Sequence, residues 1–186
     1  MADWKDELPD RVSLSWEYTP LQHVAKQGLS ILRRQAELQE NLGEAGPTLS
    51  ANTMHSNVWQ AAQGLWNSRH YGEAVSAAAK SVNAMLQTKV GRRDVSESQL
   101  VAESFSLDQP KPGAPRLRLL VNDGSDTFKS LHTGVMAFGQ GCFKAIRNVI
   151  AHEHGDLSDP PESEALEYLA SFSALARWID KAQVER

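Results

Sequence analysis

The stretch "KAIRNVIAHEHGD", residues 144–156, places an arginine and a histidine five positions apart. An arginine guanidinium stays charged at neutral pH and binds phosphate or carboxylate groups through paired hydrogen bonds. An imidazole titrates near neutral pH, so it can accept or donate a proton during a reaction. Arg147 and His152 are therefore candidates for a site that holds an anion and moves a proton beside it.

Helical spacing sorts the neighbours of this pair into faces. Two apolar rows follow that spacing: Phe143, Ile146 and Ile150, and beside them Cys142, Ala145 and Val149. Lys144, Asn148 and His152 form a polar stripe, and Arg147 flanks it. Two apolar rows predict a helix packed deep in a bundle, so we expect the stripe in a cleft or at an interface.

The spacing within the stripe limits which side chains can meet in one chain. Arg147 and His152 lie about 140° apart on a regular helix, which does not place them side by side. Asn148 and His152 are four positions apart and are neighbours on a helix, so the carboxamide can orient the imidazole. A second copy of the chain, an unwound helix end or the reach of the arginine would be needed to bring Arg147 and His152 together.

An ordinary helix end is the alternative interpretation of this stretch. Cations near the last carbonyl groups of a helix favour its dipole by about 0.3–1 kcal/mol. Glu153, His154 and Asp156 fit a solvated loop. Cys142 fits a small core residue, and Lys80 fits a side chain that extends from an alanine-rich face to solvent.

Composition excludes several classes of protein. The 186 residues carry a net charge of -4, so RNA binding would need a local basic site. The single cysteine cannot form an internal disulfide, which favours a reducing cytoplasm. No Cys and His set has zinc spacing, so no metal or other cofactor is expected. The polar start "MADWKDELPD" does not resemble a signal peptide, and no apolar run is long enough for a membrane span.

Hydrophobic periodicity predicts an all-α protein with a helical bundle of four to five main helices. The expected helices cover residues 21–42, 51–67, 71–90, 96–105, 126–152 and 162–183. Gly91 is expected to end the third helix, and "RLRLLV" can pair as a short strand. Residues 1–50 form an N-terminal extension with one amphipathic helix, and residues 51–186 form the bundle. His55, His70 and His132 have no partner visible in the sequence and are taken as structural or surface residues.

Several stretches resemble a known family. "IRNVIAH" is similar to the Arg-x4–6-His signature of the HEPN superfamily of all-α proteins. The stretches "LWNSRHYGEAVSAAAKSVNAML", "GCFKAIRNVIAHE" and "EALEYLASFSALARWIDKA" follow in the order of the phage-associated Ymh-type family within it. The likeness covers roughly residues 55–184. Two departures concern this chain: Ala77 and Asn83 stand where the family often has glutamates, and Val149 stands where it often has proline.

The resemblance implies a HEPN-like bundle and a metal-independent endoribonuclease that acts as a homodimer. In many such proteins two motif helices face each other, which would unite two Arg/His sets in one cleft. Arg147 and His152 would then be catalytic, and Asn148 and Lys144 would bind the single-stranded RNA substrate. The resemblance also implies a role in phage conflict or as a toxin, with a possible antitoxin or other protein partner. The alternative is a non-catalytic HEPN-like module that binds RNA, a nucleotide or a protein.

Overall fold

The computed structural model describes residues 19–42, 49–152 and 159–186 of the chain. The chain divides into two compact units between residues 48 and 49. The first unit contains α1 (Thr19–Leu42), which confirms the predicted first helix. Val24 and Ile31, two apolar residues seven positions apart on α1, are exposed, and so is Leu32. These side chains of α1 therefore do not form a core of their own.

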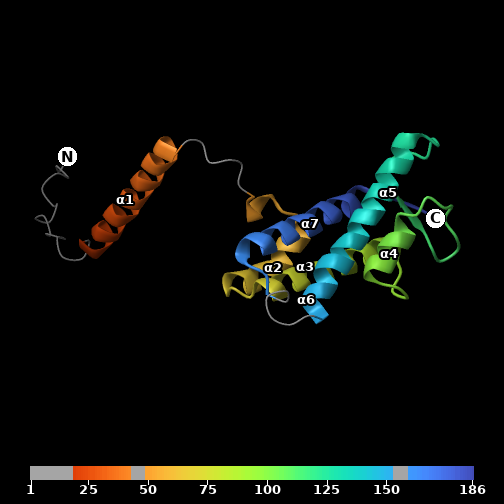
Figure 1. Ribbon diagram of the computed structural model, residues 1–186, viewed down its shortest axis with the longest axis horizontal. Coiled ribbons are helices and arrows are strands. Elements are labelled where there is room, and N and C mark those ends of the chain that lie inside the picture. Colours follow the sequence, from red (N-terminus) through yellow and green to blue (C-terminus); the bar gives the residue numbers. More distant parts are fainter. Residues whose placement is uncertain (1–18, 43–48, 153–158) are drawn as a thin grey trace, which may run out of the picture. The chain divides into compact units, whose positions relative to one another are not determined.

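The second unit is an all-α bundle, as the sequence predicts. A short 3-10 turn (Ala51–Thr53) leads into α2 (Ser56–Asn67), and α2 and α3 (Tyr71–Val90) form a helical hairpin. The last helix, α7 (Glu162–Lys181), packs against both α3 and α2, as Figure 1 shows.

Alanines on α3 explain why three helices can pack so closely. Ala74, Ala78 and Ala79 are fully buried, and their small side chains let the neighbouring helices approach the α3 backbone. Gly91 follows the helix with φ of 70°, a left-handed conformation that glycine adopts without strain. The prediction that Gly91 ends this helix is therefore confirmed.

The predicted long helix of residues 126–152 is present as one continuous rod of three parts (Figure 1). These parts are α5 (Asp126–Gly141), the π-helical segment η3 (Cys142–Arg147) and α6 (Asn148–His152). The rod packs against α4 (Glu97–Ser104) and α7. A Cβ atom at Gly139 would lie 2.7 Å from the Val101 side chain, so glycine is required where α5 crosses α4.

A two-stranded antiparallel sheet was predicted only in part. β1 (Arg116–Arg118) lies within "RLRLLV" and pairs with β2 (Gln183–Glu185), with Leu117 opposite Val184. The last helix therefore ends at Lys181 and not at the predicted residue 183, because the chain turns extended at Ala182 and joins β1.

The second predicted helix also begins later than expected. The helical conformation is interrupted at Met54 and His55, and α2 starts at Ser56. His55 stabilises this start because its Nδ1 accepts a hydrogen bond from the backbone N–H of Asn57, at 3.3 Å. Its own backbone N–H donates to Oγ of Ser173, at 2.7 Å. Throughout the described ranges, every helix is too short or too polar to cross a membrane.

Candidate functional site

A π-helical segment carries the candidate arginine. Residues Cys142–Arg147 are wound more widely than an α-helix, and Arg147 is the last of them. Single π turns inside α-helices are rare and are frequent at functional sites. The wider turn also changes the 100° spacing on which the predicted stripe depends. Lys144 and His152 are exposed while Asn148 is half-buried, so the three side chains do not share one environment.

Two side chains fix the position of the Arg147 guanidinium. Its Nε lies 3.0 Å from Oε1 of Glu97, the first residue of α4. Its Nη1 donates a hydrogen bond to Oδ1 of Asn148, also at 3.0 Å. The Arg147 side chain keeps 21% of its exposure and that of Glu97 keeps 23%. The guanidinium is therefore held by two partners on different helices and still reaches solvent.

Glu97 has a strained backbone. Its φ is 53°, in the left-handed region that residues with a Cβ atom rarely adopt. The backbone N–H of Glu97 donates to Oδ1 of Asn83 on α3, at 2.6 Å. Ser96 stands at the N-cap position of this helix, but its side chain makes no capping hydrogen bond. A residue from another helix therefore holds the first residue of α4.

The energies of these features are of similar size and opposite sign. A left-handed residue with a Cβ atom costs about 1–2 kcal/mol. A partly exposed ion pair such as that of Glu97 with Arg147 contributes about 0–1 kcal/mol. The pair therefore offsets at most part of the strain that Glu97 carries.

His152 lies at the exposed end of α6. The sequence predicts a contact between Asn148 and His152, but within the described residues no hydrogen bond joins them. Oδ1 of Asn148 accepts from Arg147 instead. The structure thus unites Arg147 with Asn148 and Glu97, and it leaves Lys144 and His152 exposed to solvent. Glu153, His154 and Asp156 lie outside the described residues.

A known protein family matches most of the chain. The sequence profile of a family described as "Protein of unknown function (Hypoth_ymh)" matches residues 52–179. The chain belongs to this family. The match runs from the start of the bundle into α7 and includes Asn83, Glu97, Arg147 and His152. Searches of curated proteins and of solved structures find no match to the chain.

Sequence reasoning missed Glu97 as a partner of Arg147 in this candidate site. Glu97 lies 50 positions from Arg147, so no local spacing connects the two. Asn83 was singled out only because it stands where the family often has a glutamate. The carboxylate beside Arg147 comes from α4, and Asn83 on α3 accepts from its backbone N–H. A glutamate at the first position of a short helix is the one signal in the sequence, and it is weak.

The other histidines have structural or surface positions, as the sequence predicts. His132 is fully buried: its Nδ1 lies 2.8 Å from the Phe128 carbonyl and its Nε2 accepts from the Leu119 N–H at 3.0 Å. The ring is therefore a neutral tautomer that ties the strand segment to α5. His55 caps α2 as described above, and His70 is exposed before α3.

Cys142 and Lys80 also lie where the sequence predicts. Cys142 is buried at the start of the π segment, and this burial raises the pKa of its thiol to about 11. Lys80 is exposed on α3. In the ranges that the structure covers, no three His, Cys, Asp or Glu side chains gather closely enough to hold a metal ion.

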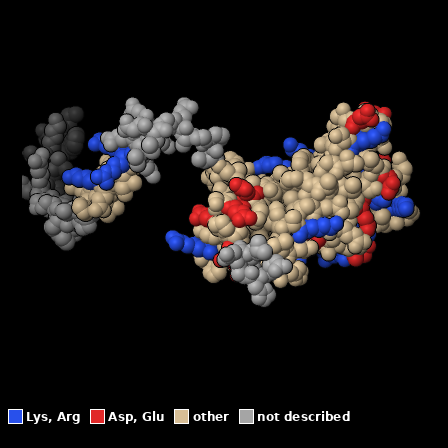
Figure 2. Space-filling view, in the orientation of Figure 1, with Lys and Arg blue, Asp and Glu red and all other residues tan. Residues whose placement is uncertain are grey.

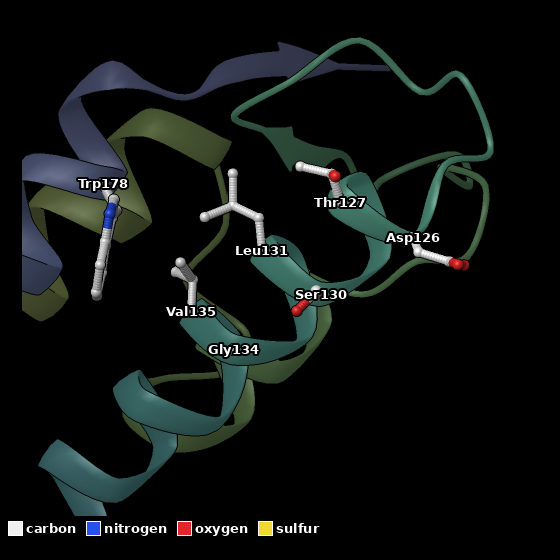
Figure 3. A pocket seen from close by; sticks show the side chains of 7 residues that line it. All are labelled: Asp126, Thr127, Ser130, Leu131, Gly134, Val135 and Trp178. Atoms are coloured by element: carbon white, nitrogen blue, oxygen red, sulfur yellow. The ribbon is translucent and has the colours of Figure 1, made fainter.

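Two hollows of the bundle adjoin this rod, and neither is lined by Arg147 or His152. A groove of about 610 Å³ runs between the first half of α5 and α7 (Figure 3). Leu131 and Val135 of α5 and Trp178 of α7 line its apolar part, and Asp126 and Ser130 lie along its polar part.

A smaller hollow of about 230 Å³ adjoins Ile150 of α6 and carries Glu73 and Asp159, so it is acidic. On the face drawn in Figure 2, basic and acidic side chains alternate over the bundle and no single basic patch stands out.

Proposed function

We propose that this chain is a HEPN-type, metal-independent endoribonuclease that acts as a homodimer with a composite Arg/His site. The observation that carries the proposal is the guanidinium of Arg147, which is oriented by Glu97 and Asn148 and still reaches solvent. His152 lies exposed five residues later, within reach of a substrate that covers the end of the rod.

The proposed reaction uses a nucleophile that RNA itself supplies. The 2′-hydroxyl oxygen attacks the adjacent phosphorus, and the bond from phosphorus to the 5′-oxygen breaks. One imidazole takes the proton of the 2′-hydroxyl and a second imidazole donates a proton to the leaving 5′-oxygen. The products are a 2′,3′-cyclic phosphate and a 5′-hydroxyl, so the step needs neither metal nor water.

Arg147 supplies the charge that this reaction needs. The guanidinium binds the phosphate oxygens and stabilises the extra negative charge of the transition state. Asn148 orients the guanidinium through its carboxamide oxygen. Lys144, exposed on the same segment, attracts the RNA backbone by its charge.

A second copy of the chain would supply the second imidazole. It would also explain a set of exposed glycines on α5 that lower helix stability. Gly134 and Gly141 lie seven positions apart on α5, both are exposed, and a Cβ atom at either would meet nothing within 4 Å. Each glycine costs about 1 kcal/mol relative to alanine in a helix. Together with exposed Ala137 and Ala145 they form a smooth face that leads to Arg147 and suits close contact with the same face of a partner.

The biological role we propose is phage conflict, either as a defence protein or as a toxin held inactive by an antitoxin or other protein. The support is the family resemblance of the motif-bearing stretches, together with a chemistry that would be harmful to a cell if unrestrained. A cytoplasmic location follows from this role, because the RNA substrate is there.

A second function has one observation in its favour. Glu97 already neutralises much of the charge of Arg147, and the chain as a whole carries a net charge of -4. Both features suit a non-catalytic HEPN-like module that binds RNA, a nucleotide or a protein. Such a module would shift RNA in a gel in a salt-dependent way and leave it intact.

Purified protein incubated with single-stranded RNA in excess chelator tests the proposal. We expect cleavage that leaves cyclic phosphate and 5′-hydroxyl ends and that is lost in Arg147→Ala and His152→Ala. A Lys80→Ala variant serves as control, because Lys80 is an exposed cation on another helix. Cleavage that survives both substitutions, or that requires Mg²⁺, would contradict the mechanism.

A further inference from the structure

Two helices of the bundle contact the Arg147 guanidinium, and a third helix supports one of these contacts. Asn83 of α3 accepts from the backbone N–H of Glu97, and Glu97 of α4 contacts Nε of Arg147. Asn148 of α6 accepts from Nη1 of the same guanidinium. Nη2 makes no hydrogen bond with any described residue. The guanidinium is thus fixed on two of its nitrogens, and the edge formed by Nη1 and Nη2 remains for an anion.

The ion pair of Glu97 is not needed to attach α4 to the bundle. Leu100 and Val101 of α4 are fully buried in the core. Glu103, on the same helix, pairs with Arg92 just beyond the end of α3, and Arg92 lowers the pKa of the Glu103 carboxyl. These contacts already anchor α4, so the strained backbone at Glu97 has no evident role in holding the helix.

The strain has a local use instead. A left-handed first residue directs the N–H of Glu97 to Asn83 and places its carboxylate on Arg147. Strained residues cluster at functional sites, where the surrounding structure holds side chains in a fixed geometry. A side chain misplaced by about 1 Å can reduce a reaction rate by about 100-fold, so fixing a catalytic guanidinium has a large effect on rate.

We propose that Glu97, held by Asn83, is the positioning residue for Arg147 and presents the Nη1 and Nη2 edge of its guanidinium to the scissile phosphate. This inference rests on the proposed ribonuclease function. It adds two residues to the site that neither the Arg/His motif nor the family match assigns. Neither of them touches the RNA: Glu97 acts through Arg147, and Asn83 acts through Glu97.

The first part of the test observes Arg147 directly and needs no activity. In ¹⁵N-labelled protein, the Nε–H resonance of Arg147 is identified by its loss in Arg147→Lys. We expect Glu97→Gln and Asn83→Ala to shift this resonance and to speed its exchange with water. Glu103→Gln is the matched control, because it removes an arginine-paired glutamate from the same helix and is expected to leave the resonance unchanged.

The second part measures cleavage kinetics of the same variants on single-stranded RNA. We expect Glu97→Ala to lower kcat by about 100-fold and Glu97→Gln, which keeps an acceptor atom, by about 10-fold, with KM changed less than kcat. Asn83→Ala is expected to lose about 10-fold, and Asn83→Asp, which keeps the acceptor for the Glu97 N–H, to recover most of it. Glu103→Gln is expected to cleave like the parent protein.

The two parts separate this inference from the proposed function. If the parent protein does not cleave RNA but the Arg147 resonance responds to Glu97→Gln and not to Glu103→Gln, the ribonuclease proposal fails and the positioning of Arg147 by Glu97 stands. If the resonance is unchanged in Glu97→Gln, or if Glu97→Gln and Glu103→Gln cleave equally well, the inference is overturned.

Discussion

Two arginines of the bundle, Arg118 and Arg147, are held in very different ways. Arg118 on β1 is 7% exposed, and all three of its guanidinium nitrogens have partners. Nε contacts Glu185 of β2 at 2.6 Å, and Nη1 and Nη2 donate to the carbonyl oxygens of Ser106 and Asp108. The guanidinium also lies 5.8 Å from the ring centre of Phe128. Every nitrogen of this guanidinium is therefore engaged, and its burial keeps the remaining N–H groups away from a ligand in solvent.

Arg147 is three times as exposed and is bound on only two nitrogens by described residues. One of its partners, Glu97, adopts a strained backbone that the ion pair hardly offsets. A structural arginine gains from every available partner, as Arg118 does. An arginine that must bind a phosphate needs free donors and a fixed direction, and Arg147 has both. Under the proposed function, the comparison separates an arginine that stabilises the fold from one that binds the substrate.

The largest expected effect is on cleavage at Arg147. Arg147→Ala is expected to lower the cleavage rate by about 100- to 1,000-fold, because the variant loses a preorganised positive charge that stabilises the transition state. The melting temperature is expected to stay within about 3 °C of the parent, since a half-exposed ion pair contributes little. Thermal melts and single-turnover assays measure both. A large loss of stability would show that Arg147, like Arg118, mainly stabilises the fold.

Arg118 is expected to show the opposite pattern. Arg118→Ala leaves Glu185 and the carbonyl groups of Ser106 and Asp108 without their donor, and we expect it to lower the free energy of unfolding by about 3 kcal/mol. Arg118→Lys, which keeps the charge but not the fork of donors, is expected to lie in between. Urea denaturation measures the change. A loss below about 1 kcal/mol would remove the contrast between the two arginines.

A substitution on the smooth face of Gly134 and Gly141 is expected to change the stability of one chain less, and to change dimerisation clearly. Gly141→Glu is expected to raise the stability of one chain by about 0.7 kcal/mol through helix propensity, and to abolish the dimer and cleavage. Gly64→Glu on α2 is the matched control, because Gly64 is also exposed with nothing within 4 Å of a Cβ atom.

Gly64→Glu is expected to gain the same stability and to remain dimeric. Sedimentation and denaturation measure the two quantities. Equal behaviour of the two variants in sedimentation would exclude this face as the dimer contact.

The smallest expected effect is on the chemical labelling of Cys142, which lies on the buried side of the π segment. Because burial raises the pKa of the Cys142 thiol to about 11, only about one thiol in 1,000 is ionised at pH 8. The thiolate is the reactive form, so we expect a thiol reagent to label the native protein far more slowly than the unfolded protein, without loss of cleavage. Rapid labelling under native conditions would show that the π segment opens to solvent.

Local patterns in the sequence predict most of the fold. The alanine-rich pattern of α3 predicts both of its ends, and Gly91 at its end is confirmed, because propensity and capping depend on neighbouring residues. The β1–β2 pair was not predicted as a pair, since Leu117 and Val184 meet only through the tertiary fold. For the same reason the last helix was predicted two residues too long.

The candidate site was predicted only as far as its local part extends. Arg147 and Asn148 are adjacent in the chain and do meet. The π segment and the left-handed Glu97 depend on how α4, α5 and α3 pack together, and no spacing in the sequence encodes them. The predicted contact of Asn148 with His152 is not made among the described residues, and the carboxamide oxygen of Asn148 accepts from Arg147 instead.

One measurement tests the composite site most directly. Arg147→Ala and His152→Ala chains carrying different tags are co-expressed, and the mixed dimer is purified through both tags and given single-stranded RNA in chelator. Each variant alone lacks either every Arg147 or every His152, whereas the mixed dimer keeps one Arg147 and, on the other chain, one of the two imidazoles of the proposed step.

A composite site predicts that the mixed dimer cleaves at least about 10-fold faster than either variant alone and yields cyclic phosphate ends. A mixed dimer no more active than its parents, beside an active doubly tagged parent dimer, would contradict the account.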